Sequence, residues 1–319
     1  DHVQAEKVRV ALPGRAVSLS TGSSSSCAVL EDGRVSCWGA IAPGNTPALV
    51  AGVDDAAQVA VGQGYGGGDH ACALIADGSV RCWGNGERGQ LGDDSLLSHD
   101  DASTVVDMVD AHQIATGLSF SCAVHGDDEL SCWGAGRPAP EPILADVLSV
   151  TTNYGYTCAV RSDRSLVCRE EASYTSDPTE FVGVGLAQVV SVSGGSSHVC
   201  ALLEGGQVWC WGDNSLGQIG VGVTETETPR RVDDLGPIAA VASGNGHTCA
   251  LEVGGRVYCW GGGDNGALGQ GCPESSAKPV AANIGGVVTI SAGDDVTCAL
   301  DADGRVWCWG WEIGGRLGR

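Results

Sequence analysis

Residues 72–83 read Cys-Ala-Leu-Ile-Ala-Asp-Gly-Ser-Val-Arg-Cys-Trp, and the organisation of the whole chain follows from this stretch. Apolar and polar side chains alternate on both sides of an Asp-Gly dipeptide, which is typical of two antiparallel strands joined by a tight turn. A helical repeat would instead place apolar residues about 3.6 residues apart. The stretch therefore predicts a β-hairpin with a cysteine on each strand.

The same pattern recurs along the 319-residue chain. Fourteen of the fifteen cysteines form seven pairs whose members lie ten residues apart, and successive pairs begin 45, 50, 36, 42, 49 and 49 residues apart. A β-rich unit of this length is typical of one four-stranded propeller blade. We therefore expect a single domain over residues 1–319, with hairpins at 27–37, 72–82, 122–132, 158–168, 200–210, 249–259 and 298–308.

The spacing of ten also predicts how the cysteines pair. A three-residue hairpin loop favours a left-handed last residue, commonly Gly. Five of the seven units have Gly at that position, as in Ala76-Asp77-Gly78, whereas units three and four have Asp128 and Arg164. With such a loop, residues ten apart face each other at a distance that a disulfide spans. The expected bridges are Cys27–Cys37, Cys72–Cys82, Cys122–Cys132, Cys158–Cys168, Cys200–Cys210, Cys249–Cys259 and Cys298–Cys308.

Two other uses of the cysteines fit the pattern less well. Reduced thiols packed in a core would not fall into register seven times, and structural zinc sites use about two to four intervening residues. We expect disulfides, and therefore an oxidising compartment: secreted, periplasmic or cell-surface. Cys272 has no partner in this scheme, and we expect a free thiol there.

Charge and hydrophobicity exclude several classes of function. Acidic residues number 39 and basic residues 17, giving a formal charge of −22, so nucleic-acid backbones and anionic membrane surfaces would repel the chain. No apolar run of about 18 residues is present, so we expect no membrane insertion. Hydrophobic residues make up 43% of the chain, which is enough for a packed core.

Further recurring motifs identify the repeat. Six units continue as Cys-Trp-Gly, with Trp38, Trp83, Trp133, Trp211, Trp260 and Trp309. Four of them add a Gly-x-Leu/Ile-Gly turn, at 89–92, 217–220, 266–269 and 315–318. With the Gly-x-x-His stretch at 244–247, these motifs closely resemble the repeats of the regulator of chromosome condensation family. The resemblance covers nearly the whole chain and implies an all-β, seven-bladed β-propeller of RCC1-like repeats. Unit four departs from it, with Arg169-Glu170 in place of Trp-Gly, and units one, three and four lack the turn.

The chain ends predict how the ring closes. Several units have a valine twelve residues before the glycine of the next blade, as Val50 and Gly62 do, and Val182 and Gly194 follow the same spacing. Val10 precedes Gly22 in this way although no hairpin comes before it, and residues 315–319 end before an outer strand. We therefore expect residues 7–12 to complete the last blade, so that no sheet edge is left unpaired.

No motif for catalysis or cofactor binding emerges. His70, His198 and His247 each stand two residues before the first cysteine of their unit, and a position set by the repeat favours a structural role, with the ring bonded to turn backbone. Nucleophile elbows, zinc-protease helices and P-loops are absent from the sequence. Recurring Asp-Asp pairs fit no EF-hand spacing and are typical of a solvated acidic surface. We expect no enzyme activity, no cofactor and no metal.

Aromatic residues concentrate at one end of the predicted blades. In a four-stranded meander, the loops after the first and third strands leave at one end, here called the loop face, and the hairpin tips leave at the other, the tip face. Unit two has a five-residue insertion on the loop face. The predicted partner-binding residues there are Tyr65, Asp69, Phe120, Tyr154, Tyr156 and Trp311. Aromatic residues on loops are typical of protein interfaces; the alternative is that some of these rings pack inward between blades.

The sequence thus favours a monomeric, non-enzymatic scaffold, secreted or on the cell surface, that binds a protein. The resemblance, combined with cysteine hairpins, points to a bacterial source. It also leaves two alternatives by analogy: a secreted enzyme inhibitor of the β-lactamase-inhibitor propeller type, and a guanine nucleotide exchange factor, which is the activity of the family's namesake. Disulfides argue against the cytosolic or nuclear partner that nucleotide exchange requires, and a fold does not by itself select a ligand.

Mass mapping of an unreduced digest should return seven bridges, each joining cysteines ten residues apart, because the hairpin register brings those pairs together. A thiol assay on the denatured protein should count about one free thiol, at Cys272. Bridges between different units would contradict the register, and a count near fifteen would indicate a reducing compartment.

Overall fold

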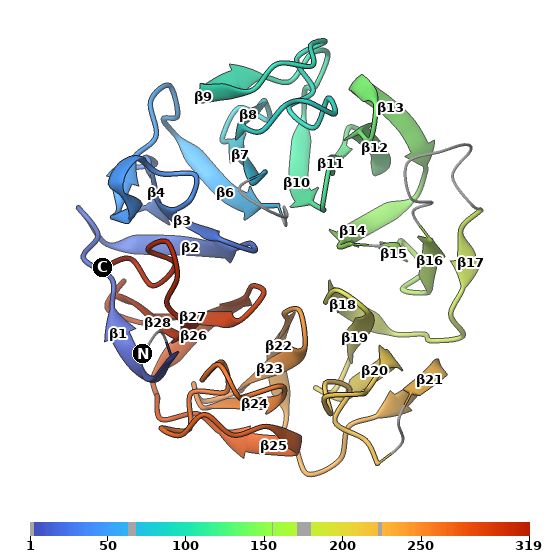
Figure 1. Ribbon diagram of the computed structural model, residues 1–319. Coiled ribbons are helices and arrows are strands. Elements are labelled where there is room, and N and C mark those ends of the chain that lie inside the picture. The colour runs from blue at the N-terminus through green and yellow to red at the C-terminus, as the bar shows by residue number, and fades with distance from the viewer. Residues whose placement is uncertain (1–2, 63–67, 155, 171–179, 223–224) are drawn as a thin grey trace.

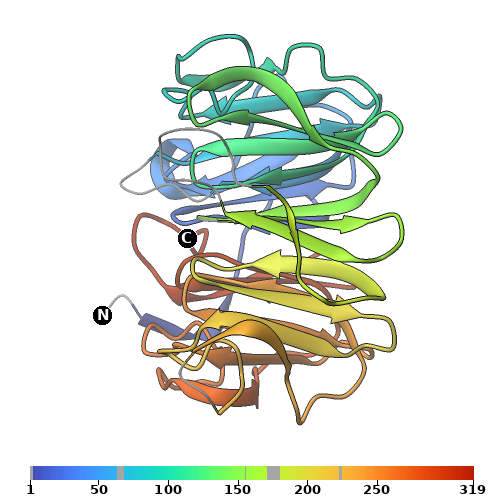
Figure 2. The same ribbon diagram turned by 90° about the vertical axis from the view of Figure 1, so that its right-hand side faces the viewer.

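The computed structural model describes residues 3–62, 68–154, 156–170, 180–222 and 225–319. Seven four-stranded antiparallel sheets stand around a central axis (Figure 1), and a quarter turn shows the ring edge-on as a thick disc with loops at both ends (Figure 2). The described residues contain one short 3-10 turn, η1 (Pro43–Asn45), and no helix in them is long and apolar enough to cross a membrane. The predicted all-β, seven-bladed propeller is confirmed.

Each blade consists of four strands, named here from the axis outward. Blade 1 contains β2 (Ala16–Thr21), β3 (Ser25–Leu30), β4 (Val35–Gly39) and β5 (Ala48–Leu49). Blade 2 contains β6 (Ala56–Val61), β7 (His70–Ile75), β8 (Val80–Gly84) and β9 (His99–Thr104). Blade 3 contains β10 (Ala111–Thr116), β11 (Phe120–His125), β12 (Glu129–Gly134) and β13 (Arg137–Leu144). Blade 4 contains β14 (Val147–Thr152), β15 (Tyr156–Arg161), β16 (Leu166–Glu170) and β17 (Val182–Gly183).

The remaining three blades follow the same order. Blade 5 contains β18 (Val189–Gly194), β19 (His198–Leu203), β20 (Val208–Asp213) and β21 (Glu225–Arg231). Blade 6 contains β22 (Ile238–Ser243), β23 (His247–Glu252), β24 (Val257–Gly261) and β25 (Ser276–Ala281). Blade 7 contains β26 (Val287–Ala292), β27 (Val296–Asp301), β28 (Val306–Trp311) and, outermost, β1 (Val3–Arg9).

The second and third strands of every blade form the hairpin that the cysteines predict. Cys72 faces Cys82 in the register of β7 and β8, and the equivalent cysteines face each other in the other six blades. The seven disulfides join cysteines ten residues apart, with Cα atoms 4.0 to 4.1 Å apart. Cys272 is free and half-buried. The predicted pairing is therefore confirmed.

The hairpin tips join each blade to the next. The third loop residue is left-handed in all seven blades: φ is 80° at Gly33 and 63° at both Asp128 and Arg164. The carbonyl of this residue accepts a hydrogen bond from the first residue of the next inner strand, as Gly33 O does from Ala56 N at 2.8 Å. The other six bonds, 2.9 to 3.1 Å long, run from Ala111 to Gly78, Val147 to Asp128, Val189 to Arg164, Ile238 to Gly206, Val287 to Gly255 and Ala16 to Gly304.

The N-terminal strand completes the last blade, as predicted, because β1 pairs with β28. Its bounds, Val3–Arg9, differ from the expected 7–12. Val10 N donates to Val306 O at 2.9 Å, in the way that Val50 N donates to Val35 O at 3.0 Å. Val10 and Val50 therefore follow the outer strand, whereas the sequence prediction had placed the strand around Val10. In blade 4 the equivalent bond is donated by Val184 N to Leu166 O, and Val182 lies within β17.

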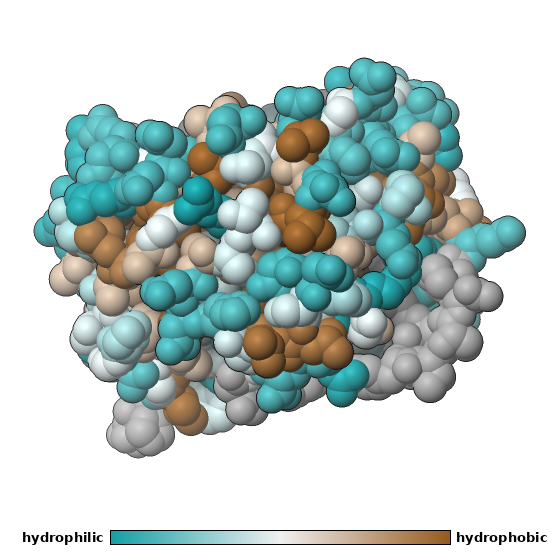
Figure 3. All heavy atoms as spheres, turned by 90° about the horizontal axis from the view of Figure 1, so that it is seen from above, coloured by the Kyte–Doolittle hydropathy of each residue, from teal (hydrophilic) through white to brown (hydrophobic). Residues whose placement is uncertain are grey.

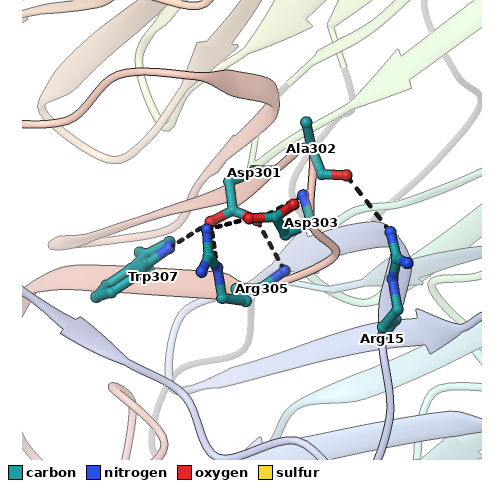
Figure 4. Close-up of polar contacts among 6 residues, drawn as sticks. All are labelled: Arg15, Asp301, Ala302, Asp303, Arg305 and Trp307. Atoms are coloured by element: carbon teal, nitrogen blue, oxygen red, sulfur yellow. Dashed lines mark hydrogen bonds and ion pairs between the residues drawn. The ribbon is translucent and has the colours of Figure 1, made fainter.

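A polar network holds the tip of blade 7 where the ring closes (Figure 4). The Asp301 carboxylate accepts hydrogen bonds from Trp307 Nε1 at 3.0 Å and Arg305 Nε at 2.8 Å, and Arg15 Nη2 donates to Ala302 O at 3.5 Å. Desolvation alone would raise the pKa of Asp301, but the hydrogen bonds outweigh it and hold this pKa at about 2. The ionised carboxylate thus fixes the turn whose Gly304 carbonyl accepts from blade 1.

The hydrophobic core is divided among the junctions between blades. Trp133 of blade 3, for example, packs in one cluster with Cys72, Cys82 and Leu91 of blade 2. On the side of the ring drawn in Figure 3, apolar residues appear in small groups among hydrophilic ones. Stability therefore depends on each blade having a neighbour, which makes closure of the ring important.

Deleting residues 1–12 should leave β28 as an unpaired edge, because β1 is its outer partner. We expect less cooperative thermal unfolding by calorimetry and concentration-dependent aggregation by light scattering, although the disulfides preserve each hairpin. Unchanged melting and solubility after the deletion would show that β1 is dispensable for closure.

Candidate binding face

At the loop face, the first loop of each blade begins at the mouth of the central channel. Its first residue donates to the start of the second strand, as Gly22 N does to Ser25 O at 2.8 Å. Neighbouring loops approach so closely that a Cβ on Gly22 would lie 2.3 Å from Gly62 O. The seven equivalent positions are Gly22, Gly62, Gly117, Asn153, Gly195, Gly244 and Gly293. In unit five the position is Gly195, because its N–H bonds His198 O; the sequence spacing had indicated Gly194.

Tyr154 spans this mouth. Its hydroxyl lies 3.0 Å from Ser23 Oγ of blade 1 and donates to Asp294 Oδ1 of blade 7 at 3.2 Å, although Tyr154 itself belongs to blade 4. Burial raises the pKa of Asp294, and neighbouring Asp295 adds to that effect, against the opposing hydrogen bond from Tyr154. The half-buried Tyr154 therefore ties opposite sides of the ring together.

Two of the predicted partner-binding residues are buried. Asp69 is 3% exposed, and its Oδ2 accepts from Ser24 Oγ at 2.9 Å, which links the first loops of blades 2 and 1. Phe120 is 5% exposed and packs so tightly over Gly117 that a Cβ there would lie 2.6 Å from its ring. For Phe120, the alternative of inward packing is the one that the geometry favours.

The other predicted residues lie nearer the surface. Half-buried Trp311 has the Arg316 guanidinium 5.5 Å from its ring centroid. Half-buried Tyr156 lies with its hydroxyl 3.5 Å from Glu170 Oε1, and desolvation, followed by the charge of Glu170, raises its pKa. Tyr65 lies outside the described residues.

A second recurring contact was not anticipated from the sequence: the tryptophan of one blade bonds to the Gly-x-Leu-Gly turn of the preceding blade. Trp133 Nε1 donates to Gln90 O at 3.0 Å, and Gly92 of the same turn lies against the indole. The other three turns receive the same bond, namely Trp38 to Arg316 O at 3.0 Å, Trp260 to Gln218 O at 2.9 Å and Trp309 to Ala267 O at 2.8 Å. The turn therefore fills the junction between two blades.

The repeat histidines belong to the same junctions. His70 Nε2 lies 2.9 Å from Ser121 Oγ of blade 3, which donates to Gln90 O at 3.0 Å. Because the hydroxyl proton is used in that bond, Nε2 carries the hydrogen that it donates to Ser121. Burial, which lowers the pKa of His70 to about 4, keeps the ring neutral. His198 and His247 make equivalent bonds to Thr248 and Thr297. The structural role matches the prediction, but each histidine bonds directly to a hydroxyl of the next blade. That hydroxyl in turn donates to the backbone carbonyl of the turn.

Two junctions keep the tryptophan but lack the turn. Units one and four lack it, and the Nε1 atoms of Trp83 and Trp211 in the following blades reach no turn carbonyl among the described residues. A cavity of about 520 Å³ adjoins Trp83 together with Leu49, Asp100 and Asp101. Another of about 580 Å³ adjoins Trp211 together with Tyr156, Glu170, Asp213, Glu225 and Glu227. The absence of the turn from units one and four is visible in the sequence. Its consequence, a cavity beside the tryptophan of the next blade, could be recognised only after the structure had shown that turn and tryptophan pair across units.

The third exception differs, because unit three lacks the turn and unit four lacks the tryptophan. Arg169 occupies the tryptophan position, is 4% exposed, and places its guanidinium 5.0 Å from the Phe181 ring centroid. The junction between blades 3 and 4 is therefore closed in another way.

The channel itself offers neutral polar groups. A cavity of about 300 Å³ follows the inner strands, and Ser, Thr and Gln supply its polar side chains. Gln58 bridges to blade 3 through its amide, which donates to Ile114 O at 3.0 Å and accepts from Ile114 N at 3.1 Å. Across the described part of the chain, no group of three or more metal-binding side chains comes together.

Comparisons with known proteins agree with this architecture. Two models of the regulator of chromosome condensation (RCC1) repeat match the chain, one at residues 16–40, 58–90, 189–218 and 238–267, the other at 205–251 and 254–300. The structure is similar to that of Prp20p from Saccharomyces cerevisiae, with 17% identity, a TM-score of 0.74, and coverage of 94% of this chain and 83% of that one. Human WBSCR16 is 19% identical, with a TM-score of 0.75 and coverage of 96% of this chain and 89% of that one. The ectodomain of the Physcomitrella patens receptor kinase CR4 is 21% identical, with a TM-score of 0.59 and coverage of 93% of this chain and 73% of that one.

Acidification should destabilise the junctions well before general acid unfolding. Desolvation lowers the pKa of His70 and His247 to about 4 and that of His198 to about 3. An unfolded chain, with histidine pKa values of about 6.5, binds these protons earlier. Stability should be full above pH 6.5 or so and fall progressively toward pH 4, as measured by urea unfolding across that range. A His70→Gln variant should show a flatter profile; an equally steep one would contradict this origin.

Proposed function

Because the chain belongs to the regulator of chromosome condensation (RCC1) repeat family, we propose that it is a non-enzymatic scaffold, secreted or on the cell surface, that binds a protein through its loop face. The observation that carries the proposal is the pair of cavities at the turn-less junctions. Both lie at ends of strands that lead into loop-face loops, and both adjoin a tryptophan whose Nε1 receives no turn carbonyl from the residues that the structure describes.

The seven disulfides support the location. The first cysteine of every pair is only 0 to 1% exposed, so the bridges are buried. Disulfides persist in oxidising compartments. Their short loops give a rigid frame for loops that differ from blade to blade, and rigid scaffolds with variable loops are well suited to recognition.

Similar propellers support a protein as the ligand. Work on Prp20p describes its binding properties to Gsp1p and histones, and the same yeast protein has been solved bound to Kap60. The formal charge of −22 on this chain favours a basic partner, whose association would be accelerated at low salt.

Half-exposed aromatic residues provide the test of the face. Tyr156→Ala and Trp311→Ala should each weaken partner binding by about thirtyfold, which corresponds to roughly 2 kcal/mol for an aromatic anchor. Melting temperature should change little. The partner is first isolated by capture from the secreted fraction of the source organism on immobilised protein, and its affinity for each variant is then measured by calorimetry.

Two sets of controls accompany these variants. Asp32→Ala and Asp303→Ala lie on the tip face, and both should bind as the unmodified protein does. Phe120→Ala should lower stability by about 3–5 kcal/mol because the ring is buried. Loss of binding in the tip variants, with the aromatic variants unaffected, would place the interface on the opposite face and refute the proposal.

A further inference from the structure

At four junctions, a Gly-x-Leu-Gly turn supplies two things to the next blade. Its x residue offers a backbone carbonyl to the tryptophan Nε1, at 2.8 to 3.0 Å. Its aliphatic residue fills the space beside that indole: Leu91, Ile219, Leu268 and Leu317 are all 0% exposed. An occupied junction is thus defined by one carbonyl and one buried aliphatic side chain.

The junction between blades 1 and 2 lacks the turn that supplies them. Trp83 is 2% exposed, and its Nε1 is closed off from solvent with no acceptor among the described residues. The loop residues that pack in its cluster are buried Ala42 and half-buried Ile41, where the other clusters contain a fully buried leucine or isoleucine from the turn. A buried N–H without an acceptor is unfavourable, so this indole favours any group that brings a carbonyl.

The wall of the cavity beside Trp83 is acidic where occupied junctions are neutral. In blades 2, 3 and 6, the glycine of Cys-Trp-Gly faces a residue near the start of the outer strand: His99, Arg137 and Ser276. The residues that follow these three, namely Asp100, Pro138 and Ala277, therefore occupy equivalent positions. At occupied junctions the first glycine of the turn lies against these residues: a Cβ on Gly89 would be 2.7 Å from Pro138 Cα, and one on Gly217 would be 2.6 Å from Ala277 Cα. Asp100 therefore marks the place that a turn would occupy.

The other turn-less junction has the same feature. Gly212 faces Thr226, so Glu227 takes the position of Asp100, and it adjoins the cavity of Trp211. A carboxylate at this register position thus occurs at both junctions where the turn is missing and the tryptophan is kept. A ligand for such a site needs a positive charge close to its turn backbone.

The chain already contains a turn of that chemistry. In Gly315-Arg316-Leu317-Gly318, the Arg316 carbonyl accepts from Trp38 Nε1 at 3.0 Å, and Leu317 is fully buried. We propose that the junction between blades 1 and 2 binds a peptide turn of a partner protein, in which a lysine or arginine precedes an aliphatic residue. The turn carbonyl accepts from Trp83 Nε1, the aliphatic side chain occupies the space beside Ala42, and the cation pairs with Asp100 and Asp101. This inference rests on the proposed function, because it names the chemistry of the partner.

The site has room to admit such a turn. The cavity measures about 520 Å³ and adjoins both Ala42 and Trp83. To reach Nε1, the turn displaces the short loop at Ala42, and that loop continues into Gly44, around whose Cβ position nothing lies within 4 Å. The movement meets no packed neighbour at that glycine, whereas at Asn45 the loop lies against Gly315 of blade 7, where a Cβ would be 2.2 Å from Asn45 O.

The probe is an acetylated peptide copying residues 313–319, Ile-Gly-Gly-Arg-Leu-Gly-Arg. In protein labelled with ¹⁵N at tryptophan, the Trp83 Nε1–H resonance should move saturably as peptide is added, whereas the Trp133 resonance, whose hydrogen bond is internal, should stay in place. Trp83→Phe should weaken binding about fivefold, as expected for one lost hydrogen bond. A peptide with Glu in place of its first Arg should not bind.

Two variants separate the site from its surroundings. Ala42→Leu should abolish peptide binding by filling the space, and its melting temperature shows whether it folds. The double variant Asp100→Asn, Asp101→Asn alters exposed side chains, and should weaken binding about threefold at low salt and remove most of its salt dependence. An unmoved Trp83 resonance, or equal binding by Ala42→Leu, overturns the inference.

The same variants distinguish this inference from the proposed function. Trp133→Phe should bind the peptide as the unmodified protein does. If the natural partner binds Ala42→Leu normally but not Trp311→Ala, the loop face is an interface and the turn site is refuted. If Tyr156→Ala and Trp311→Ala leave partner binding unaffected while Ala42→Leu abolishes binding of both partner and peptide, the aromatic interface fails and the turn site stands.

Discussion

The hydrogen bond from the first residue of each inner strand to the left-handed residue at the preceding hairpin tip connects the whole ring. It recurs at all seven junctions, including Ala16 to Gly304, where the two ends of the chain meet. The bond requires a tip of fixed length and register, and the disulfide between cysteines ten residues apart holds that register in each blade. Glycine favours the left-handed conformation, but Asp128 and Arg164 adopt it as well, because the neighbouring blade supplies the same bond to their carbonyls. The hairpin is therefore both the local unit of folding and the joint between units.

The second joint, on the loop face, is less uniform, and its irregularities coincide with the candidate binding sites. A turn in one blade and a tryptophan in the next act as a pair, and the chain keeps both partners at four junctions. Where the tryptophan is kept without the turn, cavities appear beside Trp83 and Trp211. Where both are missing, Arg169 and Phe181 close the gap. Since the tip joints remain intact at every junction, the loop face can lose a turn without opening the ring. The junctions that lack a turn are therefore available for binding a partner without loss of ring closure.

Electrostatics separates the interior of the junctions from their rims. Neutral histidines and hydroxyls make up the buried chains of hydrogen bonds, because burial disfavours a charged imidazole. Carboxylates gather at the outer walls, where Asp100 and Glu227 adjoin the cavities. At the channel mouth, Tyr154 bonds to blades 1 and 7 from the opposite side of the ring. The loop face thus combines a rigid centre with acidic, incompletely packed junctions around it, and this arrangement is suited to a basic protein surface.

The amino-acid sequence by itself determined the blades, the disulfides and the closure, because each depends on residues close together in the chain or on a spacing that repeats. Cys72 and Cys82 meet through one hairpin, and Val10 repeats the position of Val50. The sequence also placed the aromatic candidates on one face, yet it did not distinguish Trp311, which lies near the surface, from Phe120, which is buried. Only the tertiary structure decided the contacts between distant units: Tyr154 with Asp294, His70 with Ser121, and Trp133 with the turn at Gln90. Such partners lie 43 to 140 residues apart, and their meeting depends on the angle between blades, which only the closed ring fixes.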